Sequence, residues 1–213
     1  MGNRDAPRLT WYFDYLSPFA YLQLATHPGL FGGDDVALKP VVFGALLSHW
    51  GNKGPAEIPP KSSFTYRQVL FHARELGVPL RFPPAIPFNP LHALRLTVAL
   101  GSGIEVVRAI FDFVWKEGRS PTDDWTVLCE RLGVADADAL CSAPEVKAEL
   151  RANGEAAITA GVFGVPTFVV DGELFWGVDA TPMLFAYLED PTLFDDPEMR
   201  RVTHLPAAVQ RKT

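Results

Sequence analysis

The sequence is poor in cysteine and has no metal-binding pattern. Its two cysteines, Cys129 and Cys141, form no Cys-x-x-Cys pair, and its five histidines form no His-x-His or His-x-x-x-His pair. A zinc site or another metal site is therefore not expected. We interpret both cysteines as small buried apolar side chains, the usual state of free cysteines in a reducing compartment.

An excess of positive charge and long apolar runs are also missing. Lys and Arg number 19 against 25 Asp and Glu, which gives a net charge of −6. Without a basic stripe, this balance argues against a nucleic-acid partner. No uninterrupted apolar run is long enough to span a bilayer, and residues 1–10 have no apolar core of a secretory signal. We expect a cytoplasmic protein that is not embedded in a membrane.

The sequence does contain an aromatic-rich segment, WYFDYLSPFAYL, at residues 11–22. Residues 9–14 predict a buried strand. Ser17 and Pro18 then predict the N-cap and the first residue of a helix over 18–26. A helix N-terminus favours negative charge, so a serine there can donate a hydrogen bond to an anion. Taken in isolation, the Ser-Pro pair favours the other interpretation, in which Ser17 only caps the helix.

The next segments predict a parallel strand and a ligand-binding loop. Residues 36–43 are apolar almost throughout, which is typical of a strand buried on both faces. After a short apolar turn at 45–50, the loop 51–55 is rich in Gly and Pro and follows a parallel strand, where ligands usually bind. Asn52 and Lys53 are its strong hydrogen-bond donors, although solvated loop residues are the alternative interpretation.

The middle of the chain predicts helices. A helix over 63–76 precedes residues 82–90, whose prolines exclude a helix or a central strand. Beyond them, one-sided apolar patterns predict helices at 91–100, 104–116, 122–133, 137–141 and 144–160. We therefore expect an inserted helical domain at 83–160 within an α/β domain formed by 9–82 and 161–190.

The α/β pattern returns near the C-terminal end. It predicts a hairpin made of strand 168–170, the turn Asp171-Gly172 and strand 173–176. A helix is expected over 180–189, with Asp179 as its N-cap. Residues 191–213, rich in proline and charge, predict a loosely packed tail.

This layout resembles a thioredoxin-like fold with a large α-helical insertion, as in the DsbA-like disulfide oxidoreductases of the bacterial periplasm. Those proteins carry Cys-Pro-x-Cys at the helix start, where this chain has Ser17-Pro18-Phe19-Ala20. Neither end of this tetrapeptide can form a thiolate, so dithiol exchange is excluded at this position.

The serine version is similar to the 2-hydroxychromene-2-carboxylate isomerases and the kappa-class glutathione transferases. The resemblance is carried by residues 13–22, by residues 163–168 and by Trp176-Gly177-Val178-Asp179; the loop 51–55 also looks like theirs. It covers roughly residues 9–190. The pairing of these motifs at this separation favours a functional role for Ser17 over capping alone.

The resemblance implies that glutathione is the cofactor and that its thiolate replaces the missing cysteine. Ser17 would be the catalytic residue that donates a hydrogen bond to the sulfur, while the helix N-terminus lowers the pKa of the thiol. Pro166 would follow a cis peptide bond. The backbone of Val165 would then pair with the peptide groups of glutathione as an added strand does.

At the other end of the tripeptide, the resemblance implies a site for the γ-glutamyl group at Trp176, Gly177, Val178 and Asp179. The N-terminus of the following helix would bind the carboxylate of the γ-glutamyl group, and Asp179 would bind its ammonium group. The family usually has a polar residue, often Asn, where this chain has Val178. We therefore expect only a backbone contact at that position.

Candidate substrate contacts are less specific. Phe13, Trp50, Phe88 and Trp176 could form the wall of an aromatic pocket, with the plain core as the alternative. Lys53 could pair with a substrate carboxylate, and Asn52 or Asn89 could polarise a substrate oxygen.

Three functions remain open at this stage. The first is a glutathione-dependent isomerase, in which thiolate addition to an unsaturated aromatic pyruvate allows rotation before the sulfur leaves. This substrate class implies a role in aromatic hydrocarbon degradation. The second is a kappa-class-like glutathione transferase or peroxidase, which consumes glutathione. The third is a redox-inactive thioredoxin-fold binding protein in which Ser17 only caps a helix. The family commonly forms dimers, so a homodimer is expected.

Overall fold

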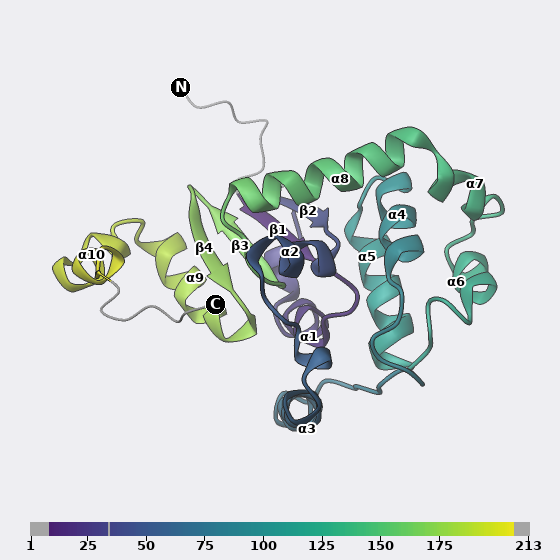
Figure 1. Cartoon of the computed structure of the whole chain (residues 1–213), viewed down its shortest axis with the longest axis horizontal. Helices are drawn as coiled ribbons and strands as arrows, with labels where there is room; N and C mark the ends of the chain where they lie inside the picture. The colour runs from purple at the N-terminus through teal and green to yellow at the C-terminus, as the bar shows by residue number, and fades with distance from the viewer. Residues whose placement is uncertain (1–8, 34, 207–213) are drawn as a thin grey trace.

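A four-stranded mixed sheet forms the centre of the protein, seen in a computed structural model that describes residues 9–33 and 35–206 (Figure 1). The strand order is β2–β1–β3–β4. The strands are β1 (Leu9–Phe13), β2 (Val36–Pro40), β3 (Thr167–Val170) and β4 (Glu173–Trp176). β1 and β2 are parallel, whereas β3 is antiparallel to both β1 and β4. The predicted strand–helix–strand unit and C-terminal hairpin are both present.

The first strand and helix form as predicted. Trp11 and Phe13 of β1 are fully buried, and their rings stack with centroids 4.6 Å apart. Helix α1 (Pro18–Thr26) begins directly after Ser17, whose side-chain oxygen accepts a hydrogen bond from the backbone N–H of Ala20 at 3.2 Å. Pro18 occupies the first turn, where its missing N–H costs no hydrogen bond.

The prediction for residues 36–50 is wrong in two respects. β2 ends at Pro40, and as an edge strand its residues 36–39 are only half-buried. The expected turn is a helix, α2 (Phe43–Trp50). A proline cannot donate to a strand ladder, and the Asp14 carboxylate accepts a hydrogen bond from the backbone N–H of Phe43 at 2.8 Å, which supports a helix start there.

Helices dominate the middle of the chain, as expected. They are α3 (Pro59–Glu75), α4 (Leu91–Ala99), α5 (Ile104–Phe111), α6 (Trp125–Arg131), α7 (Ala137–Ser142) and α8 (Pro144–Thr159), and a π-helical turn, Asp112–Lys116, extends α5. Figure 1 shows α4 to α7 grouped on one side of the sheet, with α8 running from α7 back across it. Accordingly, α8 packs against α4, α7, α2 and β2.

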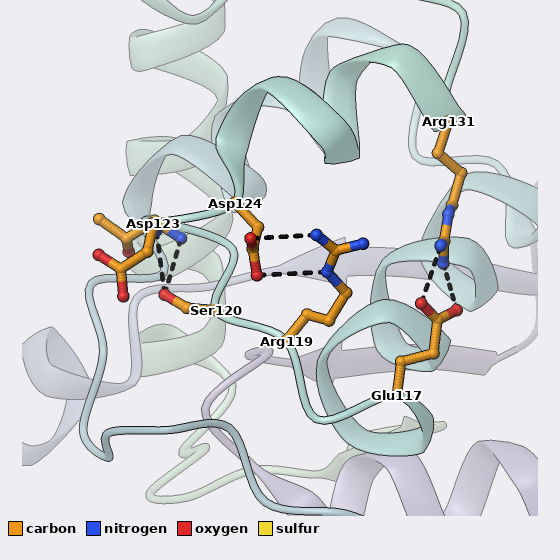
Figure 2. A network of polar contacts seen from close by, with 7 residues as sticks. Glu117, Arg119, Ser120, Asp123, Asp124 and Arg131 are labelled. Carbon is orange, nitrogen blue, oxygen red and sulfur yellow. Dashed lines mark hydrogen bonds and ion pairs between the residues drawn. The ribbon is translucent and has the colours of Figure 1, made fainter.

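A turn at Ser120 delays the start of α6 to Trp125, three residues after the predicted position (Figure 2). The Ser120 hydroxyl oxygen accepts hydrogen bonds from the backbone N–H groups of Thr122 and Asp123 at 3.3 and 3.0 Å. Figure 2 also shows two arginine side chains near this turn, each paired with a carboxylate. Arg119 binds both oxygens of Asp124, and Arg131 binds both oxygens of Glu117.

The sheet and the inserted helices share an aromatic core. Phe111 packs on Tyr15 with ring centroids 4.8 Å apart, and the Trp115 indole N–H donates to the Tyr15 carbonyl at 2.8 Å. All three side chains are fully buried. Burial of such large rings stabilises the contact between the two parts.

At the C-terminal end, Asp171 and Gly172 both have positive φ angles, 51° and 89°, as a two-residue hairpin requires. Helix α9 spans Thr181–Glu189, and its N-cap is Ala180, so the prediction that Asp179 caps it is wrong. The reason is a 3-10 turn, Val178–Ala180, which precedes the helix and contains Asp179.

The predicted loose tail contains a short exposed helix, α10 (Pro197–Thr203), on the side of the molecule opposite α4 to α7 (Figure 1). Residues 207–213 of that tail, and residues 1–8 in which no secretory signal is expected, lie outside the described residues. Among the residues that are described, no helix combines the length and apolar character needed to cross a bilayer.

Candidate active site

Ser17 lies where the start of α1 meets the loop before β3. Its hydroxyl donates a hydrogen bond to the carbonyl oxygen of Val165 at 3.3 Å and accepts one from the N–H of Ala20. Ser17 and Val165 are 148 positions apart in the chain, and both are buried. The antiparallel pairing of β1 with β3, which sets Tyr12 opposite Thr167, brings them together.

The loop that carries Val165 has the geometry that the resemblance implies. The Val165–Pro166 peptide bond is cis. The Pro166 carbonyl accepts a hydrogen bond from the backbone N–H of Gly177 at 2.8 Å, and the Thr167 hydroxyl donates to the Gly164 carbonyl at 2.8 Å. The loop is therefore tied to the end of β4 as well as to α1.

The residues after β4 lie beside this loop. Trp176 is half exposed, and its ring meets that of Phe163 edge to face with centroids 5.0 Å apart. A Cβ atom on Gly164 would lie 2.5 Å from the Trp176 indole nitrogen, so the indole closely covers Gly164. Gly177 has a φ of 90°, and a Cβ atom there would lie 2.5 Å from a carboxylate oxygen of Asp179. Glycine at both positions permits this close packing.

A cleft of about 450 Å³ runs along these groups. Its lining includes six of the seven expected glutathione-binding residues, Val165, Pro166, Trp176, Gly177, Val178 and Asp179. The seventh, Ser17, is buried next to Val165 and does not itself line the cleft as described. The lining also includes Phe19 from α1, and Gln68 and His72 from α3, which the sequence analysis did not single out. Gln68 and His72 stand one helical turn apart on a largely exposed helix, a pattern that does not distinguish binding residues from solvated ones.

The candidate substrate residues lie elsewhere. Within the described chain, the lining of this cleft includes none of Asn52, Lys53 and Asn89. Asn52 and Lys53 are exposed in the loop after α2. The side-chain oxygen of Asn89 accepts a hydrogen bond from the backbone N–H of Leu91 at 3.0 Å, at the start of α4.

The four aromatic candidates divide between the core and the surface. Phe13 and Phe88 are buried in the core, which was the alternative interpretation. Trp50 is partly exposed, and its indole N–H donates to the Val162 carbonyl at 2.9 Å. Trp176 alone among the four lines the described cleft.

Asp14 supports the loop that carries Ser17. Its carboxylate is fully buried and accepts hydrogen bonds from the backbone N–H groups of Leu16 at 3.0 Å and Phe43 at 2.8 Å. Its carbonyl accepts a further one from the N–H of Ser17 at 3.0 Å. Burial raises the pKa of Asp14 to about 6, although the two backbone donors act in the opposite direction.

The described residues offer neither a metal centre nor a thiol at this site. Among them, no group of three or more His, Cys, Asp or Glu side chains is arranged to hold a metal ion. Cys129 and Cys141 are free and buried, and pack with Leu96 and Ala137 in the helical insertion. Burial raises the pKa of both thiols, so the interpretation of these cysteines as buried apolar side chains is confirmed.

Comparison with known proteins identifies the family. The model of the DSBA-like thioredoxin domain matches residues 8–189. A 2-hydroxychromene-2-carboxylate isomerase of Sphingobium xenophagum is 31% identical over 85% of this chain and 98% of its own length. Glutathione S-transferase kappa 2 of Caenorhabditis elegans is 27% identical over 90% of this chain and 95% of its own length.

Solved structures agree on the fold. A 2-hydroxychromene-2-carboxylate isomerase structure superposes with a TM-score of 0.74 at 25% identity, covering 93% of this chain and 99% of that one. The cytosolic disulfide reductase DsbM of Pseudomonas aeruginosa, solved with GSH, has a TM-score of 0.57 at 16% identity, covering 92% and 96%. The predicted thioredoxin-like fold with a helical insertion is confirmed. The chain belongs to the DsbA-like thioredoxin-domain family, in the group of the 2-hydroxychromene-2-carboxylate isomerases and kappa-class glutathione transferases.

Proposed function

We propose that this protein is a glutathione-dependent isomerase that acts on an unsaturated aromatic pyruvate of the 2-hydroxychromene-2-carboxylate type. The observation that carries the proposal is the contact of the Ser17 hydroxyl, at the start of α1, with the Val165 carbonyl. A hydroxyl thus occupies the helix N-terminus where related oxidoreductases have a thiol. The relatives named as isomerases support the same reaction class.

The residues along the cleft suit glutathione. A volume of about 450 Å³ lies within the range of small-ligand sites. The cleft has the Asp179 carboxylate on its lining for an ammonium group, and the backbone of Val165 is next to it for peptide pairing. The buried N-terminus of α1 favours an anion, because the positive end of the helix dipole attracts negative charge.

Bound glutathione would supply a thiolate that adds to a conjugated double bond and is released after rotation. Ser17 would turn its hydroxyl from the Val165 carbonyl toward that anion, and the present bond of 3.3 Å is long enough to give up at little cost. The N-terminus of α1 would lower the pKa of the thiol. Trp176 and Phe163 would offer aromatic surface to the substrate. Asn52, Lys53 and Asn89 lie outside the cleft lining and stay proposed contacts to the substrate oxygens.

A second candidate function is a kappa-class-like glutathione transferase or peroxidase, which the kappa-class relatives from Caenorhabditis elegans favour. It needs the same activated thiolate. The two candidates differ in the fate of glutathione, which an isomerase regenerates and a transferase or peroxidase consumes.

Stoichiometry tests the choice. With an unsaturated aromatic pyruvate as substrate, we expect isomerisation that requires glutathione and leaves its total concentration unchanged. Loss of one thiol per product molecule would support the transferase, and loss coupled to hydroperoxide reduction would support the peroxidase. If calorimetry detects no binding of glutathione, both enzymatic functions fall and a redox-inactive binding protein takes their place.

A further inference from the structure

Gln23, in the middle of α1, is a buried glutamine that connects the core to the turn after β4. Its side chain is 1% exposed. The amide oxygen accepts a hydrogen bond from the Trp11 indole N–H at 2.7 Å. The amide nitrogen donates to the Gly177 carbonyl at 3.2 Å and to the Thr181 hydroxyl at 3.0 Å. Both amide hydrogens therefore have an acceptor, as a buried amide requires.

Thr181 extends this contact by one residue. Its hydroxyl oxygen accepts from Gln23 and donates to the Val178 carbonyl at 2.7 Å. The carbonyls of Gly177 and Val178, which directly precede Asp179, are thus both held from the α1 side. On the other side, the Gly177 N–H donates to the Pro166 carbonyl.

Backbone hydrogen bonds from the Gly177 N–H to the Pro166 carbonyl and from the Thr181 N–H to the Val178 carbonyl hold part of this turn, and the side chains of Gln23 and Thr181 add to them. Gly177 has a φ of 90°, a region that glycine enters and leaves easily. The N-cap of α9 is Ala180, whose side chain carries no hydrogen-bonding atom. The hydrogen bonds of the Gln23 and Thr181 side chains to this turn, here called the clamp, therefore help to keep Asp179 at a constant distance from α1 and Pro166.

We propose that Gln23 is a positioning residue for the γ-glutamyl end of the glutathione site, acting through Gly177 and Thr181 on the turn that carries Asp179. This inference rests on the proposed function. Preorganised binding groups raise affinity because less conformational freedom is lost on binding. Gln23 lies about 9 Å along the helix axis from Ser17, at ~1.5 Å per residue, so it acts on glutathione affinity and not on the reacting sulfur.

Two substitutions break the clamp and one preserves it. Gln23→Met keeps the length of the side chain without its polar atoms, Thr181→Val keeps the shape without the hydroxyl, and Thr181→Ser keeps the hydroxyl. We expect Gln23→Met and Thr181→Val to raise both the Kd and the KM for glutathione about tenfold, because the turn that carries Asp179 is then less well preorganised for binding. At saturating glutathione, kcat should change less than about twofold, and Thr181→Ser should resemble the wild type.

Asn153→Leu is the matched control. It removes a different buried amide, which donates to the Pro40 carbonyl at 3.3 Å between α8 and β2, and should leave the Kd unchanged. Wild-type Kd values in both Gln23→Met and Thr181→Val, or a fall in kcat at unchanged Kd, would overturn the positioning role while the proposed function stands. If the wild-type protein itself does not bind glutathione, the proposed function and this role fall together.

Discussion

At the scale of single residues, the Ser17 hydroxyl has a capping role that is visible in the structure and a catalytic role that we propose. Ser17→Ala should lower turnover about a hundredfold, the usual effect of removing one donor to a developing anion. Glutathione affinity should change little, because the γ-glutamyl and peptide contacts remain. Steady-state kinetics together with calorimetry measure both quantities.

Loss of the cap itself needs a control, since an N-cap serine contributes about 1 kcal/mol to stability. Asp196→Ala supplies it, because Asp196 caps α10 by accepting hydrogen bonds from the N–H groups of Glu198 and Met199, far along the chain from Ser17. That variant should keep wild-type turnover. Equal turnover in Ser17→Ala and the wild type would mean that the Ser17 hydroxyl does no more than cap α1.

Asp14 predicts a pH dependence of stability. Burial raises its pKa to about 6, so between pH 4 and 6 the folded protein holds a proton that the unfolded chain releases. The stability gained from protonating Asp14 is therefore complete below the pKa that Asp14 has in the unfolded chain. It is lost as the pH rises through about 6, the pKa in the folded protein. Asp14→Asn removes this dependence.

Denaturant unfolding of both proteins at two pH values measures the effect. The free energy of unfolding of the wild type minus that of Asp14→Asn should be larger at pH 5 than at pH 7, by about 1 kcal/mol. An unchanged difference would show that the Asp14 carboxyl titrates in its ordinary range despite its burial, and a difference that shrinks at pH 5 would show that folding lowers its pKa.

At the scale of elements, the turn between β4 and α9 predicts a specific sensitivity. Gly177→Ala forces a residue with a side chain into a φ of 90° and sets its Cβ atom against the Asp179 carboxylate, which has to move. We expect the Kd for glutathione, measured by calorimetry, to rise about tenfold or more.

Gly172→Ala is the control for backbone strain alone. Gly172 has a similar φ of 89° in the β3–β4 hairpin, and a Cβ atom there would meet no heavy atom of the described chain within 4 Å. It should cost about 1 kcal/mol of stability and leave the Kd unchanged. Similar Kd values in the two alanine variants would rule out Asp179 as the group that the substitution disturbs.

Residues 36–50 show where an element cannot be read from its own residues. The segment is apolar over most of its length, so periodicity alone does not separate a strand from a helix. Two facts decide it: the edge position of β2, and the Asp14 carboxylate that supports the start of α2. Both depend on how distant segments pack, as does the 3-10 turn that displaces Asp179 from the cap of α9.

At the scale of the whole molecule, the sequence predicts the fold because its signals are paired. The Ser-Pro helix start and the Val-Pro-Thr strand start lie far apart in the chain, and together they are more specific than either motif alone. The same pairing predicts that Ser17 and Val165 meet. Gln23, Gln68 and His72 could not be predicted, because their roles arise from contacts between α1, α3 and the turn after β4 that carry no local pattern.

The central claim is that glutathione supplies the reactive sulfur and that the start of α1 stabilises it as a thiolate. The most direct measurement is the ultraviolet absorbance of the thiolate of bound glutathione as a function of pH. The account predicts a pKa at least about one unit below the ordinary value of a free thiol, about 8.5, and a partial return toward that value in Ser17→Ala. A bound thiol that titrates like free glutathione, in both the wild type and Ser17→Ala, would contradict it.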